Sequence, residues 1–215
     1  MDIAILVFDR LTALDAVGPY EVLARLPGAR VRFVAPARGL VRTDNGMLAL
    51  HADVGIDEVA RADLLIVAGG FGTRVLEKDE RVLDWVRAID RTTRITASVC
   101  TGALVLAAAG LLVGRRANTH WAVRERLREH GALPVAERVV RDGKYATAAG
   151  VSAGIDFALT LAEELAGRAT AEAIQLGIEY DPAPPFDAGS PERAPSAVRD
   201  AVQQRVRARD AELRA

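Results

Sequence analysis

ITASVCTGALVLAAAGLL, residues 95–112, joins an apolar strand to an apolar helix through a single cysteine. Residues 95–99 form a short hydrophobic run typical of a buried strand, and residues 101–112 have the length and composition of a buried helix. Cys100 lies at the junction, and Gly102 falls in the first turn of the helix, where its missing side chain leaves room for a tight turn. The pattern therefore predicts a nucleophile elbow, which presents Cys100 on a sharp turn.

The same alternation of strand and helix extends to both sides of this segment. Strands are predicted at residues 3–8, 31–35 and 64–68, helices at residues 16–26, 78–90, 121–130, 155–165 and 169–178, and hairpins at residues 41–50 and 135–147. We expect an α/β fold with a mostly parallel central sheet covered by helices on both faces. In such folds the ligand site lies at the carboxyl ends of the strands.

The composition changes after Tyr180. Residues 181–195 contain five prolines and predict an extended arm, and residues 196–214 predict a charged helix with few apolar positions. We expect residues 1–180 to form the α/β domain, and residues 181–215 to belong either to the same domain or to a dimer interface.

The overall composition excludes several classes of function. The chain has 215 residues with 28 basic and 29 acidic side chains, so it carries no excess of basic charge for nucleic acid or membrane lipid. Its longest apolar runs are too short to span a bilayer, and the first residues lack the basic start of a signal peptide. A single cysteine excludes an intramolecular disulfide and favours a cytoplasmic location. One cysteine and three histidines without paired spacing predict no metal site.

Cys100 has two possible roles. At the start of a helix its sulfur would lie near the positive end of the helix dipole, which favours the reactive thiolate. The alternative is a buried structural cysteine, because free cysteine is among the most buried residue types.

Two further strand ends carry candidate site residues. Gly69, Gly70 and Gly72 follow a buried strand, and their amides could stabilise an anion, although a turn that requires positive φ explains them equally. Asp15 follows the first strand and is either a helix N-cap or a carboxyl that exchanges a proton with substrate. Burial and a neighbouring thiolate would raise the pKa of such a carboxyl.

Two weaker candidates complete the set. His120 could act as a base for the cysteine, or it could be a packing residue at a helix start. Glu21 is either a second carboxyl of the site or an exposed helix residue. The residue after Cys100 is Thr101 and not histidine, which lowers the case for protease-like chemistry.

At these residues the chain resembles the ThiJ/PfpI superfamily, which has the class I glutamine amidotransferase-like, or flavodoxin-like, fold. The similar segments are LDAVGPYEVLARLP (residues 14–27), AGGFG (68–72), SVCTGALVLAAAGLLVGRRANTHW (98–121), ERVVRDG (137–143), AGIDFALTLAEEL (153–165) and EYDPAPPFDAGSP (179–191). The SVCTGA turn is shared with many members, including sensor domains of AraC-type regulators. The proline-rich arm is more particular to the isonitrile hydratases of this superfamily.

The resemblance implies hydration of an isonitrile, R–N≡C, to an N-substituted formamide. Cys100 would attack the terminal carbon, Asp15 would supply a proton and then position water, and a covalent thioimidate would hydrolyse. Amides near Gly70 and Thr101 would stabilise developing charge, and the Thr101 hydroxyl would contact Asp15 or water. The resemblance implies no cofactor and a homodimer, with the arm and terminal helix packing on the neighbour. Residues 146–150 contain fewer glycines than the resemblance to the isonitrile hydratases leads us to expect. We expect this difference to affect the substrate range.

Two alternatives stay open: a ligand- or redox-sensing protein, and another cysteine-dependent enzyme of the superfamily. An AraC-type regulator would need a DNA-binding domain, and the 35 residues after Tyr180 (215 minus 180) are too few for a pair of helix-turn-helix units.

Overall fold

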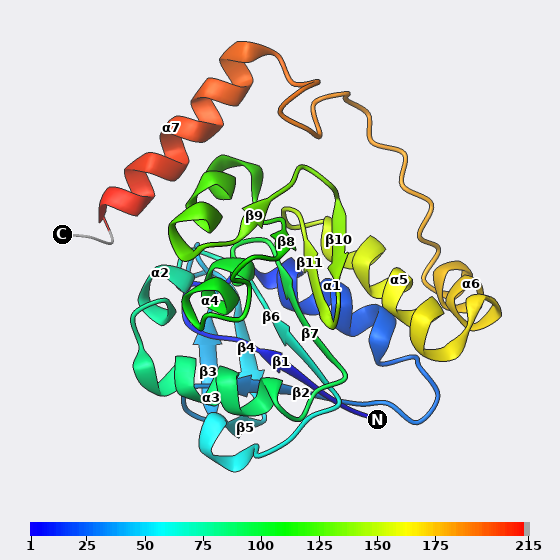
Figure 1. Ribbon diagram of the computed structural model, residues 1–215. Coiled ribbons are helices and arrows are strands. Elements are labelled where there is room, and N and C mark those ends of the chain that lie inside the picture. Colours follow the sequence, from blue (N-terminus) through cyan, green and yellow to red (C-terminus); the bar gives the residue numbers. More distant parts are fainter. Residues whose placement is uncertain (213–215) are drawn as a thin grey trace.

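A seven-stranded sheet forms the centre of the computed structural model, which describes residues 1–212 (Figure 1). Its strands run in the order β10-β11-β7-β6-β1-β2-β5, and all neighbours are parallel except the pair β10 and β11. The strands are β1 (Asp2–Leu6), β2 (Arg30–Ala35), β5 (Val54–Gly55), β6 (Leu64–Val67), β7 (Ile95–Val99), β10 (Val139–Asp142) and β11 (Tyr145–Ala148). The predicted α/β fold with a mostly parallel sheet is confirmed.

Helices cover both faces of this sheet. One face carries α1 (Ala13–Leu23), α5 (Ala153–Ala166) and, packed on α5, α6 (Arg168–Gly177). The other carries α2 (Thr73–Leu76), α3 (Glu80–Asp90), α4 (Gly102–Ala108) and the 3₁₀ helix η2 (Trp121–His130). Smaller elements are the ribbon of β3 (Gly39–Arg42) and β4 (Ala49–Ala52), the pair β8 (Arg116–Ala117) and β9 (Leu133–Pro134), and η1 (Ile56–Glu58).

The strand order explains where a site can form. From β1 the chain crosses through α1 to β2 on one side, and later returns to place β6 and β7 on the other side of β1. The order therefore reverses at β1 and β6, and in open α/β sheets the crevice at such a switch point holds the ligand. Every residue of β6 and β7 is buried, as expected of central strands covered on both faces.

Both predicted hairpins are present, as β3–β4 and β10–β11, but three helices differ from prediction. The helix predicted at residues 101–112 is α4, which ends at Ala108. The helix α1 begins at Ala13, so Pro19 lies inside it and Asp15 is its third residue rather than its N-cap. Residues 121–130 form a 3₁₀ helix, in which side chains three apart eclipse each other. Its ion pairs Arg128–Glu125 and Arg126–Glu129 have that spacing.

The carboxyl-terminal segment ends in α7 (Ser196–Glu212), which is reached through an arm without helix or strand over residues 181–195. The last residues of the helix predicted at 196–214 lie outside the described part of the chain. Among residues 1–212, none of the helices combines the length and apolar character that crossing a bilayer requires.

Candidate active site

Cys100 occupies a strained turn between β7 and α4. Its φ is +55°, in the left-handed region that non-glycine residues rarely adopt. Its N–H donates to the carbonyl oxygens of Ala148 (3.2 Å) and Ala149 (3.0 Å), and its own carbonyl accepts a hydrogen bond from Thr119 Oγ1 at 2.7 Å. The surrounding structure thus fixes the turn, and the predicted elbow is present.

Gly102 explains how α4 can start directly on the sheet. A Cβ at this position would come within 2.1 Å of the carbonyl oxygen of Val67 in β6. No larger residue fits without moving the helix away from the strand, and that movement would carry the cysteine with it.

Asp15 lies beside Cys100 at the switch point. Its side chain is fully buried, and neither carboxyl oxygen makes a hydrogen bond of standard geometry within the described chain. Gly69 makes the approach possible, because a Cβ there would lie 2.5 Å from Asp15 Oδ2 and 2.8 Å from Cys100 Cβ. The structure therefore brings Asp15, Gly69 and Cys100 together, as the sequence predicted for strand ends at one edge of the sheet.

Burial raises the pKa of both groups. The pKa of Asp15 rises from 3.8 to about 7 through desolvation, which outweighs the opposing contacts with Cys100 and the Gly69 amide. The pKa of the Cys100 thiol rises well above its ordinary value through desolvation and the adjacent Asp15 charge. The raised pKa of Asp15 agrees with the sequence analysis, but the expected resting thiolate does not. Above about pH 7 the pair holds one proton, on sulfur, and below that pH Asp15 is protonated as well.

Two backbone amides partly offset this effect on the sulfur. Hydrogen bonds from the N–H groups of Val151 and Thr101 to Cys100 lower its thiol pKa. Val151 has a φ of +23°, so its amide is held toward the sulfur by an unusual backbone conformation. This role could not be predicted from the sequence, because a backbone amide donor carries no side-chain signature.

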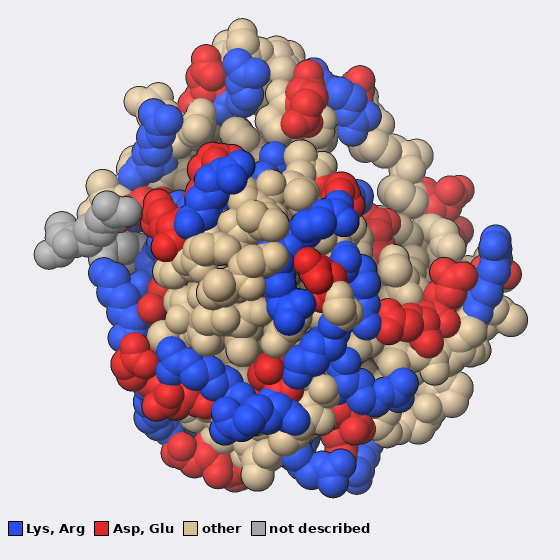
Figure 2. All heavy atoms as spheres, viewed as in Figure 1, with Lys and Arg blue, Asp and Glu red and all other residues tan. Residues whose placement is uncertain are grey.

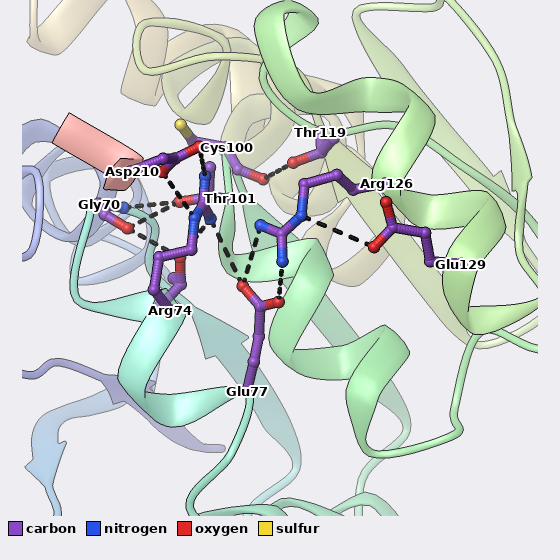
Figure 3. Close-up of polar contacts among 10 residues, drawn as sticks. Gly70, Arg74, Glu77, Cys100, Thr101, Thr119, Arg126, Glu129 and Asp210 are labelled. Atoms are coloured by element: carbon purple, nitrogen blue, oxygen red, sulfur yellow. Dashed lines mark hydrogen bonds and ion pairs between the residues drawn. The ribbon is translucent and has the colours of Figure 1, made fainter. Parts of the chain in front are cut away.

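Gly70 and Thr101 bond to each other, which changes their expected roles. The Gly70 N–H donates to Thr101 Oγ1 at 2.8 Å, and the Thr101 hydroxyl donates to the Gly70 carbonyl at 3.0 Å (Figure 3). The Gly70 amide is therefore not free to stabilise an anion. The Thr101 hydroxyl bonds to the glycine turn, and not to Asp15 or water as expected. Gly72 packs away from the cysteine, because a Cβ there would meet the Asp9 carbonyl oxygen at 2.0 Å.

A cavity of ≈240 Å³ opens onto Cys100. Its walls come from the segments that follow β1, β6, β7 and β11, from the β3–β4 turn, and from α2, η2 and α7. The lining residues are Thr12, Asp44, Gly70, Phe71, Arg74, Cys100, Thr101, His120, Val123, Val151, Val202 and Val206. Most of the exposed surface of the cavity wall is apolar. Cys100 lines the cavity but is only 4% exposed, so its side chain is largely shielded from water. The site suits a small, uncharged and largely apolar molecule.

His120 and Glu21 are not paired with the cysteine. His120 lines the cavity, but its Nδ1 accepts the N–H of Ala122 at the start of η2 (3.3 Å). Burial, together with the charges of Arg124 and Arg74, lowers the pKa of His120, so its ring is neutral near pH 7. Glu21 lies on the exposed side of α1 and pairs with Arg25 at 2.7 Å.

An ion-pair network borders the cavity on the side of α2 and α7. Arg74 bonds to Glu77 and to Asp210, and Arg126 of η2 bonds to the same Glu77 at 2.6 Å (Figure 3). The Glu77 side chain is 6% exposed, so these pairs are shielded from water more than ordinary surface pairs. Elsewhere, on the face in Figure 2, basic and acidic side chains are interspersed, in keeping with the balanced composition.

Fold and site together define a class: α/β proteins with a cysteine elbow at the sheet's switch point, next to a buried carboxyl. The chain belongs to the DJ-1/PfpI family, whose model matches residues 1–164. The resemblance found in the sequence is thereby confirmed.

Individual relatives extend the similarity to most of the chain. Isonitrile hydratase of Pseudomonas putida is 48% identical over 206 residues, which cover 96% of this chain and 90% of that protein. The crystal structure of a THiJ/PfpI family protein from Pseudomonas syringae superposes with a TM-score of 0.93 at 39% identity, covering 98% of this chain and 89% of that one. The HTH-type transcriptional regulator CdhR of Pseudomonas aeruginosa is 32% identical over 74% of this chain, which corresponds to 48% of the regulator.

Proposed function

We propose that this protein is an isonitrile hydratase, which adds water to R–N≡C and releases the formamide R–NH–CHO. The observation that carries the proposal is that Cys100 lines an apolar cavity and has the buried carboxyl of Asp15 beside it. The 48% identity to a protein of that name over nearly the full chain supports the same substrate class.

In the first step the sulfur adds to the terminal carbon of the isonitrile. The Asp15 carboxylate removes the thiol proton as the S–C bond forms, and then delivers that proton to the same carbon. The product is a thioimidate, R–N=CH–S, on Cys100, and Asp15 is again ionised. Covalent catalysis of this kind divides one difficult addition into two easier steps. The raised pKa of Asp15, about 7, suits a group that must both accept and donate a proton near neutral pH.

In the second step water adds to the thioimidate. Asp15 takes a proton from the water as it attacks the carbon and delivers that proton to the nitrogen, which gives R–NH–CH(OH)–S and leaves Asp15 ionised. Collapse of this intermediate releases R–NH–CHO and returns one proton to the Cys100–Asp15 pair. The amides of Val151 and Thr101 favour the leaving sulfur, because they stabilise its anionic form.

The roles of the glycines follow from this proposal. Gly69 is a positioning residue, since it permits contact between Asp15 and Cys100, and Gly70 and Thr101 together hold the turn that borders the cavity. We expect the proposed reaction to need no metal or organic cofactor.

The test is formamide production from an aromatic isonitrile by the parent protein, Cys100→Ala and Asp15→Asn. We expect turnover by the parent and loss of at least about 1,000-fold in Cys100→Ala, because the nucleophile is removed. Tyr20→Phe, which changes a partly exposed hydroxyl outside the cavity, serves as the control and should match the parent. Formamide production that survives in Cys100→Ala would rule out the mechanism.

Failure of the parent on several isonitriles would instead favour the other two interpretations. A redox sensor should form sulfenic acid readily at Cys100, whereas a raised thiol pKa and 4% exposure predict slow oxidation. Turnover of another electrophile with loss in Cys100→Ala would indicate a different enzyme of the family.

We further propose that the enzyme is a cytoplasmic homodimer and that residues 181–215 belong to the same domain as residues 1–180. The single cysteine supports the location, and the ion pair between Arg74 and Asp210 supports the domain assignment. Light scattering of the purified protein tests the dimer, and a monomeric mass would contradict it.

A further inference from the structure

One face of α7 lies on the domain that contains the cysteine. Its half-buried side chains recur at intervals of three or four residues, the spacing of a single helix face: Arg199, Val202, Gln203, Val206 and Asp210. Val202 and Val206 line the cavity that opens onto Cys100, and Val206 also packs against the main hydrophobic core. Val198, one helical turn earlier, is 48% exposed and does not line the cavity.

Two contacts hold the last part of α7 in place. Arg74 Nε donates to Asp210 Oδ1 at 2.9 Å, and the Arg209 guanidinium lies over the ring of Phe71, 4.9 Å from its centroid (Figure 3 shows the first contact). Phe71 lies within the glycine turn of residues 69–72, which supports Asp15 and Cys100, and Arg74 follows two residues after that turn. The last part of α7 is therefore fastened to the rim of the cavity, although an arm of irregular structure connects α7 to the rest of the chain.

The geometry of the reaction directs the variable part of the substrate at the cavity walls. The R–N≡C group is linear, so R projects away from the sulfur when the terminal carbon is attacked. In a cavity of ≈240 Å³ any R group larger than a few atoms must contact a wall. Apart from Val151 beside the sulfur, the aliphatic side chains of the lining come from Val123 of η2 and from these two valines of α7.

We propose that Val202 and Val206 are specificity-determining residues that limit the size of the isonitrile R group, an inference that rests on the proposed function. They contact R and not the reacting atoms. Removing methyl groups from this wall enlarges the space for R, and adding a ring reduces it, while the Cys100–Asp15 pair is unchanged.

The experiment measures kcat/KM for ethyl, cyclohexyl and 2-naphthyl isonitrile. In Val202→Ala and Val206→Ala, we expect the ratio of naphthyl to ethyl to rise about tenfold or more, in the range that pocket contacts of one or two carbons produce. In Val202→Phe and Val206→Phe the ratio should fall by a similar factor. Val198→Ala is the matched control on the same helix and should keep the parent ratio. Circular dichroism of each variant establishes that it is folded.

A second readout separates this inference from the proposed reaction. Alkylation of Cys100 by N-ethylmaleimide and by N-cyclohexylmaleimide needs no hydratase activity, and its rate ratio should shift in the same directions. If the parent hydrates no isonitrile while the alkylation ratio shifts as described, the proposed function is wrong, but the inference that Val202 and Val206 limit the size of the bound group is supported. If the parent is active and the isonitrile ratios of all four variants stay within about twofold of the parent, the inference is overturned.

Discussion

Replacing Asp15 with Asn should change how stability depends on pH. The carboxyl has a pKa of about 7 in the folded protein and 3.8 as its ordinary value, so the folded state binds the proton more tightly than the unfolded state does. Stability from this group is therefore present at low pH and is lost as pH rises from the unfolded toward the folded pKa. Asn cannot titrate, so the variant lacks this loss.

The size of the effect follows from the two pKa values. Between pH 5 and pH 8 the ionisation of Asp15 should cost the folded parent about 3 kcal/mol, since each pKa unit is worth roughly 1.4 kcal/mol and most of the difference falls in that interval. Relative to the parent, Asp15→Asn should gain about that much over the interval, whatever its absolute stability. Cys100 contributes little there, because its pKa lies well above this range.

Urea denaturation at several pH values measures this difference directly. Asp57→Asn is the control, because Asp57 is an exposed carboxyl paired with Arg81, and its difference from the parent should vary by less than about 1 kcal/mol. A difference between Asp15→Asn and the parent that stays constant from pH 5 to pH 8 would refute the raised pKa of Asp15.

Three further predictions concern the same site. Gly69→Ala should lower kcat/KM at least about 100-fold, because its Cβ would lie 2.5 Å from Asp15 Oδ2 and misplacement of a catalytic group is costly. Gly177→Ala is the control, because the space around Gly177 is open, and it should keep the parent kcat/KM. Equal kcat/KM values for the two variants would contradict the positioning role of Gly69. The pH profile of kcat/KM for the parent should fall tenfold per unit below about pH 7, because a second proton on the pair blocks removal of the thiol proton; a flat profile from pH 5 to pH 8 is the opposing result. Thr119→Val should lower the free energy of unfolding by about 1–3 kcal/mol, because it leaves the buried Cys100 carbonyl without its 2.7 Å hydrogen-bond partner. Thr160→Val removes an exposed hydrogen bond of the same kind and should lower the free energy of unfolding by less. The reverse order in urea denaturation would contradict this role for Thr119.

The elbow and the sheet could be predicted because they depend on local patterns. A buried strand, a cysteine and an immediate glycine leave few arrangements of residues 95–102, and strand ends in a parallel sheet meet at one edge. That rule was enough to place Asp15, Gly69 and Cys100 together although they are distant in sequence.

The state of the proton could not be predicted in the same way. The helix start alone favours a thiolate, but the actual pKa depends on how completely the sulfur and Asp15 are removed from water, which is a property of the packed structure. The hydrogen bond of the Gly70 amide could not be predicted from the sequence either. The amide donates to the Thr101 hydroxyl, which is a contact between residues 31 positions apart.

The role of α7 left a weak signal in the sequence. Val198, Val202 and Val206 follow at intervals of four, which is the spacing of one helix face, but the charged composition hid the pattern. Which of the three valines face the cavity is decided by the contacts of Arg74 and Phe71 with α7, and these contacts depend on the course of the arm.

Intact-protein mass spectrometry after rapid acid quenching tests the covalent addition most directly. Protein mixed with a slowly hydrated isonitrile should gain the full mass of that isonitrile within the first turnovers, with the added mass on the peptide that contains Cys100 and no added mass in Cys100→Ser. Formamide release at the parent rate without any such adduct, or with the adduct on another residue, would contradict addition of the Cys100 sulfur to the isonitrile carbon.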